Sequence, residues 1–226
     1  MMKNGQDNND DDIKTSMSEE NKLRQQETNG NPLKSEVTTM NYNNRAFIRH
    51  NIPCFSQRGI LQYYRTADVL LNPPLYLHII NRLKTVIENN SPSIECLASN
   101  ASRGHLYGPT VAALLQLPLI CIQKANGLPG STLQKDYSMV YSKSERLEIA
   151  YDETIKQSID GKYVALIDDC IAAGWSILAA AQLIEQAGGI VAGCFAPFND
   201  TRHGRLELFQ EKLQMMTTTF YVLNEE

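Results

Sequence analysis

The sequence predicts an α/β fold with a mainly parallel, doubly wound sheet that carries helices on both faces. Short apolar runs alternate with helical patterns along most of the chain, which is the order that builds parallel strands through helical crossovers. One such run, residues 163–167, passes directly into Asp168 and Asp169, then a short turn, then a helix. Gly188 and Gly189 end that helix before the next apolar run. With 226 residues, 42% of them hydrophobic, the chain is long enough for one globular domain.

The first 41 residues are expected to form a disordered acidic and polar tail, followed by a folded domain over residues 42–226. The tail contains no aromatic residue and few apolar ones, while Asn, Asp, Glu, Gln, Ser and Lys dominate. Such a segment cannot bury enough apolar surface to offset the entropy lost on ordering. The folded domain is therefore expected to begin near residue 42.

At the start of the folded domain, residues 45–73 are expected to be irregular, because Pro53 and Gly59 interrupt them. A helix should then begin at Pro73 with Asn72 as its N-cap. Apolar residues three and four positions apart give this helix one stripe that faces the core. The stripe consists of Leu75, Ile79, Leu83, Val86 and Ile87.

Alternating elements fill the rest of the chain. Residues 137–141 and 146–151 alternate polar and apolar side chains, which predicts a protruding β-hairpin. Short apolar runs predict the other strands, and helices are expected to alternate with them. The expected strands are residues 94–99, 119–123, 163–167, 190–195 and 220–223, and the expected helices are residues 109–116, 176–187 and 205–213.

The segment around Asp168 and Asp169 predicts a site for a phosphorylated sugar at the carboxyl edge of the sheet. The turn and the helix N-terminus that follow offer backbone N–H groups to a phosphate. The two carboxylates can accept hydrogen bonds from ribose hydroxyls, directly or through a hydrated Mg²⁺. The alternative is that the pair serves only as a helix cap.

Four blocks of sequence resemble the adenine phosphoribosyltransferase family of type I phosphoribosyltransferases, in the family's order and spacing. They are ASNASRGHLYGP (98–109), QKANGLPGST (123–132), YSMVY with LEI (137–141 and 147–149), and YVALIDDCIAAGWS (163–176). The similarity runs from about Ile52 to Leu223. It implies the type I phosphoribosyltransferase fold, with a flexible β-hairpin lid and a small N-terminal hood over the purine.

The resemblance also implies a reaction and a set of site residues. Adenine and phosphoribosyl pyrophosphate (PRPP), which carries Mg²⁺, would give AMP and pyrophosphate, with Tyr141 and Arg103 as catalytic residues. No protein side chain would bind the metal directly, although Asp168 and Asp169 would lie near it. PRPP or AMP would be bound by Ser102, Arg103, Lys124, Asp168, Asp169, Ala172, Ala173, Gly174, Trp175 and Ser176, and the purine by Tyr63, Tyr64 and Arg65.

Alternatives remain open for some of these residues. Arg103 could be an ordinary surface arginine, and Tyr63 and Tyr64 could be core or dimer-interface aromatics. The chain also departs from the family pattern at several positions, and each change removes a polar group or a small residue that the family carries there. These positions are Ala101, Gln123, Gly127, Val140, Ala173 and Trp175, and the hood also lacks the family's Phe-Arg-Asp run.

The departures leave two main hypotheses for function. The first is an adenine phosphoribosyltransferase acting in purine salvage. The second is a catalytically weak or inactive paralogue that binds nucleotide or regulates an active subunit. A purine-responsive transcription regulator would need an N-terminal DNA-binding module, and the acidic, aromatic-free tail argues against one.

The composition limits the classes of binding partner that are expected. The formal net charge of −4 predicts neither nucleic-acid nor membrane-surface binding. Five cysteines without metal-ligand spacing are typical of reduced thiols in a cytoplasmic protein. The resemblance implies a homodimer, and a heterodimer with an active paralogue would be geometrically easy.

Overall fold

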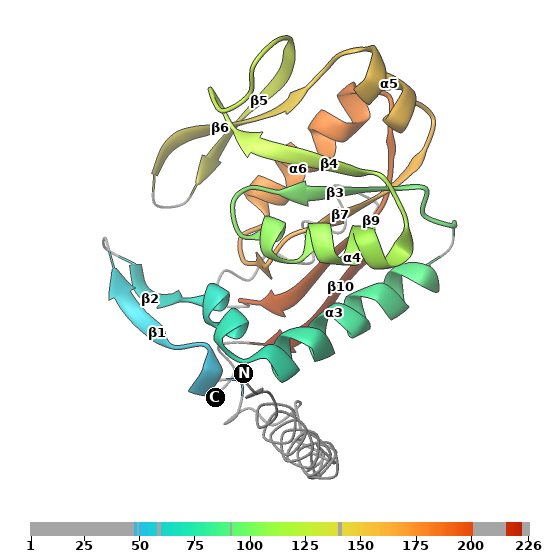
Figure 1. The fold of residues 1–226 in the computed structure, drawn as a ribbon. Helices are drawn as coiled ribbons and strands as arrows, with labels where there is room; N and C mark the ends of the chain where they lie inside the picture. Colours follow the sequence, from blue (N-terminus) through green and yellow to red (C-terminus); the bar gives the residue numbers. More distant parts are fainter. Residues whose placement is uncertain are drawn as a thin grey trace, which may run out of the picture. The chain divides into compact units, whose positions relative to one another are not determined.

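The computed structural model describes residues 48, 50–57, 60–90, 92–139, 142–200 and 216–222 (Figure 1). All of them belong to Tyr42–Glu226, the larger of the two units into which the chain divides. The expected tail, the expected helix over residues 205–213 and the expected catalytic residue Tyr141 lie outside the described residues.

The described residues form one large sheet and a separate two-stranded sheet. The strands of the large sheet are β3 (Cys96–Asn100), β4 (Leu119–Lys124), β5 (Thr132–Met139), β6 (Ser142–Ala150), β7 (Tyr163–Ile167), β8 (Cys170–Ile171), β9 (Ile190–Asn199) and β10 (Met216–Val222). Their order is β10-β9-β7-β3-β4-β6-β5, with β8 paired to β9. Strands β10 to β4 are parallel, whereas β6 runs antiparallel to both β4 and β5. The predicted mainly parallel sheet is confirmed.

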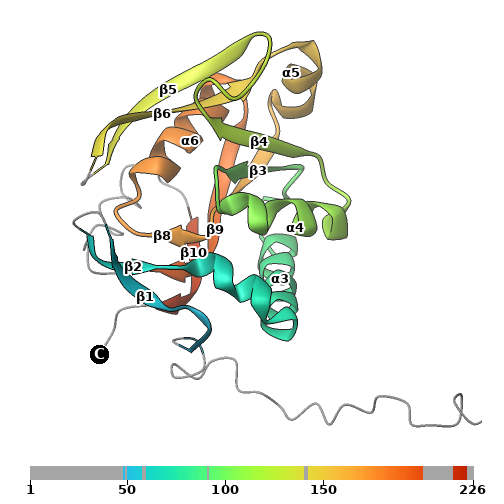
Figure 2. The same ribbon diagram turned by 60° about the vertical axis from the view of Figure 1, so that its left-hand side comes forward.

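Helices cover both faces of this sheet. They are η1 (Thr66–Leu71), α3 (Pro73–Glu88), η2 (Gly104–Leu106), α4 (Gly108–Leu115), α5 (Glu153–Ile159) and α6 (Trp175–Gln186). Figures 1 and 2 show α3 and α4 on one face and α6 on the other, as a doubly wound sheet requires. Helix α5 was not expected, since seven residues are too few to show a clear period. In the described part of the chain, no helix has the length and apolar character needed to cross a bilayer.

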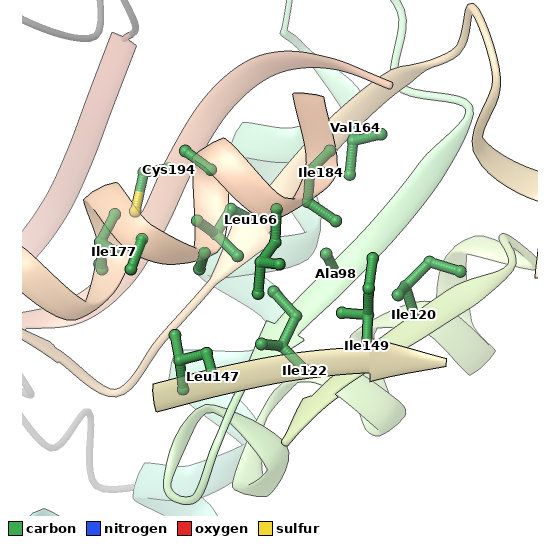
Figure 3. Close-up of a cluster of buried hydrophobic side chains, with 14 of the residues drawn as sticks. Ala98, Ile120, Ile122, Leu147, Ile149, Val164, Leu166, Ile177, Ile184 and Cys194 are labelled. Carbon is green, nitrogen blue, oxygen red and sulfur yellow. The ribbon is translucent and has the colours of Figure 1, made fainter. Parts of the chain in front are cut away.

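Two hydrophobic cores lie on the two faces of the sheet. Successive residues of a strand point to opposite faces, so Ala98 and Leu166 contribute to the core under α6 (Figure 3). Their neighbours Leu97 and Ala165 contribute to the core under α3 and α4. Burial on both faces explains why these strands are continuous apolar runs in the sequence.

The N-terminal part of the folded unit is more regular than expected. Strands β1 (Cys54–Gln57) and β2 (Ile60–Tyr64) pair antiparallel, so the prediction of an irregular segment is wrong there. The breakers fall at the ends of the strands: Pro53 precedes β1, and Gly59 lies between the two in the sequence. The prediction for α3 is confirmed, because the Asn72 side chain accepts a hydrogen bond from Leu75 N at 3.2 Å.

Candidate functional site

The carboxyl ends of β3, β4 and β7 lie at one edge of the sheet. Their parallel register brings Ser99 of β3 beside Cys121 of β4 and Ile167 of β7. Ligands of open α/β sheets bind at this edge. The segments that follow these three strands carry expected ligand-binding residues, and they therefore begin close to one another.

Asp168 and Asp169 follow β7 directly, and both are buried, with 6% and 3% of their surface exposed. Asn100, the last residue of β3, donates from Nδ2 to Asp168 Oδ2 at 2.8 Å. The Asp169 N–H donates to Asp168 Oδ1 at 2.8 Å. The helix-cap alternative is wrong, because the N-cap of α6 is Gly174, and no side chain caps that helix.

Burial dominates the electrostatics of the pair. It raises the pKa of Asp168 well above the ordinary value, and the adjacent charge of Asp169 raises it further. The hydrogen bonds from Asn100 and from the Asp169 N–H act in the opposite direction on this pKa. A ligand that supplies hydroxyl donors or positive charge would therefore relieve a cost that the free protein bears.

Arg103 connects three segments at this edge. Its Nε lies 3.2 Å from Asp169 Oδ2. Its Nη1 donates to the carbonyl oxygen of Tyr64 at 3.3 Å and to Thr66 Oγ1 at 3.4 Å. The side chain is 35% exposed and paired with a buried carboxylate. Arg103 is therefore not a solvated surface arginine.

The segment around Arg103 packs tightly against the end of β7 at Gly104. It contains a cis peptide bond between Ala101 and Ser102, and Ser102 itself is exposed. A Cβ atom at Gly104 would lie 2.7 Å from the carbonyl oxygen of Ile167. Only glycine allows the backbone to come this close, and that approach places the loop beside Asp168.

Lys124 ends β4 and interacts with the β5–β6 hairpin. Its Nζ lies 3.0 Å from Glu145 Oε2, which also accepts a hydrogen bond from Tyr137 OH at 2.8 Å. Burial raises the pKa of Tyr137, and both this bond and the charge of Asp168 add to the effect. Burial alone would raise the pKa of Glu145, but Tyr137 and Lys124 together hold it below its usual value.

A buried glutamate fixes the loop that follows Lys124. Glu148 is 1% exposed, and its Oε1 accepts hydrogen bonds from Gly127 N at 2.7 Å and Leu128 N at 2.9 Å. Its other oxygen accepts from Gln134 Nε2 at 3.0 Å. The start of the loop between β4 and β5 is thus attached to the middle of the hairpin.

The expected phosphate turn lies between β8 and α6. Its Ala172, Ala173, Trp175 and Ser176 side chains are half-buried. Gly174 has φ of 77°, a left-handed value that glycine adopts without strain. The helical hydrogen bonds begin with Leu178 N to Gly174 O at 2.9 Å. The N–H groups of the first turn of a helix point toward its N-terminal end, where an anion is favoured.

The expected purine-binding residues lie around β2. Tyr64 is half-buried, and the side chain of Tyr63 lies outside the described part of the structure. Arg65 is ion-paired with Asp68 at 2.7 Å and stacks over the ring of Phe55, with Cζ 4.9 Å from its centroid. The structure therefore brings Arg103 to Asp169 and to the Tyr64 carbonyl oxygen, whereas Lys124 pairs with Glu145 and Arg65 pairs with Asp68.

Sequence reasoning missed two polar residues of this cluster, Asn100 and Thr66. Asn100 had a detectable signal, since it is a polar residue that ends a buried strand three positions before Arg103. Thr66 had none, because it contacts Asp169 from 103 positions away in the sequence.

Known enzymes resemble this chain in sequence and in structure. No family model matches the sequence. An adenine phosphoribosyltransferase of Borreliella burgdorferi (strain ZS7) is 35% identical over 144 residues, which are 64% of this chain and 77% of that protein. The enzyme of the same name from Bifidobacterium longum (strain DJO10A) is 33% identical over 143 residues, 63% of this chain and 71% of the relative.

Solved structures agree on the fold. The crystal structure of adenine phosphoribosyltransferase from Thermoanaerobacter pseudethanolicus matches with a TM-score of 0.68 at 23% identity, over 79% of this chain and 99% of that one. The Giardia lamblia enzyme complexed with 9-deazaadenine matches with a TM-score of 0.69 at 21% identity, over 80% of this chain and 98% of that one. Together with the curated relatives, these matches show that the chain belongs to the adenine phosphoribosyltransferase family.

Proposed function

We propose that this protein transfers the phosphoribosyl group of PRPP to adenine, giving AMP and pyrophosphate. The observation that carries the proposal is the buried Asp168–Asp169 pair at the carboxyl edge of the sheet, ion-paired to Arg103. Buried carboxylates are costly to maintain and cluster at functional sites. The relatives named adenine phosphoribosyltransferase supply the substrate class.

Each part of PRPP has a counterpart at this edge. Asp168 and Asp169 would accept hydrogen bonds from the ribose hydroxyls, and the turn at residues 172–176 would bind the 5′-phosphate. Arg103 and Lys124 would bind the pyrophosphate. Both cations have carboxylate partners in the free protein, at 3.2 Å and 3.0 Å. Binding would exchange these partners for phosphate oxygens.

Magnesium would arrive with PRPP. Among the described residues, no group of three or more His, Cys, Asp and Glu side chains is arranged to hold a metal. The carboxylates of Asp168 and Asp169 suit a hydrated Mg²⁺, which keeps most of its water ligands and prefers oxygen donors. The ion would neutralise charge on the diphosphate.

The β5–β6 hairpin is proposed to close over the bound substrate. Tyr137 and Glu145 connect the hairpin to Lys124. If Lys124 exchanged Glu145 for a phosphate, the hairpin would therefore lose this contact. Closure of such a segment excludes water from the reacting centre.

A second candidate is a nucleotide-binding paralogue with weak or absent catalysis. It is favoured by uncharged residues where the family carries charged ones, namely Ala101, Gln123, Gly127 and Val140. A lost charge-assisted hydrogen bond costs about 1.5–3 kcal/mol, and each ~1.4 kcal/mol lowers a rate about tenfold. Both candidates retain a ribose-phosphate site.

A homodimer, or a heterodimer with an active paralogue, belongs to the same proposal. Leu77 on α3 and Leu114 on α4 are 55% and 48% exposed, which supports an apolar contact surface on these helices. Sedimentation of the purified protein should give a species heavier than its 25.4 kDa chain. A single species of the chain's own mass at micromolar concentration would contradict the dimer.

The deciding assay is AMP formation by the purified full-length protein from adenine and Mg-PRPP, with guanine and hypoxanthine as alternative bases. AMP formation that the Asp169→Ala variant loses would establish the enzyme. Saturable AMP or PRPP binding without turnover would favour the binding paralogue. Neither binding nor turnover would overturn both candidates.

A further inference from the structure

Thr66 is a buried polar residue between the β1–β2 sheet and the ribose carboxylates. It is the first residue of η1, two positions after β2 ends at Tyr64, and only 1% of its surface is exposed. A buried hydroxyl needs hydrogen-bond partners, since an unpaired one costs free energy. Its partners here are two residues of the candidate site.

The hydroxyl of Thr66 donates to Asp169 Oδ2 and accepts from Arg103 Nη1, which is 3.4 Å from Thr66 Oγ1. The chemistry of the groups fixes these directions. A hydroxyl carries one proton and two lone pairs, an ionised carboxylate only accepts, and a guanidinium only donates. The single proton of Thr66 therefore faces Asp169, and a lone pair faces Arg103.

Two groups of the chain thus converge on one oxygen of Asp169. Oδ2 receives the Thr66 hydroxyl and lies 3.2 Å from Arg103 Nε. Because the two oxygens of a carboxylate lie on opposite sides of its axis, the contacts at Oδ2 fix the direction in which Oδ1 points. A carboxylate held by one partner could rotate about its terminal bond, which has a broad torsional minimum.

We propose that Thr66 is a positioning residue of the ribose site, holding the Asp169 carboxylate in the orientation that accepts a hydrogen bond from a ribose hydroxyl. The inference rests on the proposed function, because it concerns the same site. It adds that the segment following β2, the strand that ends with the expected purine-binding residues Tyr63 and Tyr64, also sets the geometry of the ribose site.

The test is a thermodynamic cycle that combines a substitution at Thr66 with removal of the ribose hydroxyls from the ligand. Dissociation constants of AMP and of 2′,3′-dideoxy-AMP would be measured by calorimetry for the wild type, Thr66→Val and Thr66→Ser. Valine keeps the shape of threonine without the hydroxyl, and serine keeps the hydroxyl. Thr85→Val is the matched control, because the Thr85 hydroxyl bonds Asn81 O at 2.9 Å on the exposed side of α3.

Thr66→Val should weaken AMP binding about tenfold or more, the effect of losing one hydrogen bond to a charged group. The same variant should weaken binding of 2′,3′-dideoxy-AMP by less than about twofold, the error within which independent changes are additive. Thr66→Ser and Thr85→Val should match the wild type with both ligands. Thermal midpoints would verify folding, and Thr66→Ala would replace the valine variant if that variant does not fold.

Equal weakening of both nucleotides by Thr66→Val would show a general structural role and overturn the proposal. If the wild type binds AMP and Thr66→Val binds it with the same affinity, the proposal is overturned too, while the proposed function stays intact. A wild type that binds neither nucleotide and forms no AMP would overturn the proposed function and this inference together.

Discussion

Arg103 Nε lies 3.2 Å from Asp169 Oδ2, so the loop after β3 and the segment after β7 are joined by an ion pair at the carboxyl edge of the sheet. Removing one member of a buried pair leaves the other uncompensated, which is costly. In this protein the pair is also reached by solvent, because Arg103 is 35% exposed. The ion pair can therefore stabilise the free protein, and Arg103 is also accessible to a phosphate that arrives from solvent.

The buried carboxyl of Asp168 should make stability depend on pH. Burial and the charge of Asp169 raise the pKa of Asp168 in the folded protein. The contribution of this carboxyl to the free energy of unfolding is therefore fully present below the unfolded pKa of about 3.9, and it is lost as pH rises through the folded pKa. Asp168→Asn removes this titration. Its unfolding free energy relative to the wild type should therefore increase between about pH 4 and pH 8, on top of a constant offset from the lost acceptor. Urea unfolding across this range would check it, and a difference that is flat or falls with pH would contradict it.

Trp175 is the only tryptophan of the chain and the first residue of α6. The left-handed φ of the turn belongs to Gly174, so the tryptophan itself carries no strain from that conformation. Trp175 belongs to the turn where the phosphate is expected to bind, its side chain is half-buried, and we predict that the indole obstructs phosphate binding. Trp175→Gly should then tighten AMP or PRPP binding, and ligand should quench the wild-type fluorescence.

Trp175→Ala distinguishes the effect of removing the indole from the effect of the extra backbone freedom of glycine. Equal tightening in the alanine and glycine variants would assign the effect to the side chain, whereas tightening in the glycine variant alone would assign it to backbone freedom. Tight wild-type PRPP binding that neither variant changes would show that the indole does not obstruct phosphate binding.

Glu145 should compete with phosphate for Lys124. Glu145→Gln removes the charge that faces Lys124 Nζ, while the new amide oxygen can still accept from Tyr137 OH. Because Lys124 is 57% exposed, the pair is worth at most about 1 kcal/mol. Pyrophosphate binding should tighten by up to about fivefold at low salt and less at high salt. Calorimetry at two salt concentrations would measure this.

Asp136→Asn is the matched control for this variant. It removes a carboxylate that pairs with Arg146 on the same hairpin, and it should leave pyrophosphate binding unchanged. Weaker binding by Glu145→Gln would mean that the pair orders Lys124 for the ligand instead of competing with it.

Local patterns predicted the elements that have strong local signals. Asn72 before two prolines marked the start of α3, and buried runs such as residues 163–167 marked the central strands. The pairing of β1 with β2 was missed because two short strands with flanking breakers look irregular in sequence. Helix α5 was too short to show a period.

The site was predictable only where its residues follow strands. Asp168 and Asp169 could be assigned to the edge of the sheet because they end an apolar run, and the structure adds that both are buried. Thr66 could not be found, since its role depends on a contact across 103 positions. Likewise, the pairing of Lys124 with Glu145 depends on how β6 lies against β4, which no local pattern encodes.

The proposed function requires Asp168 and Asp169 to hold a ribose. Its most direct test is calorimetric titration of AMP into the wild type, Asp168→Ala, Asp169→Ala and the control Asp152→Ala, whose side chain caps α5. Each site variant should bind AMP about 10- to 100-fold more weakly than the wild type, the effect of losing a charged acceptor, and Asp152→Ala should bind as the wild type does. Wild-type AMP affinity in both site variants would rule out ribose binding by the two carboxylates.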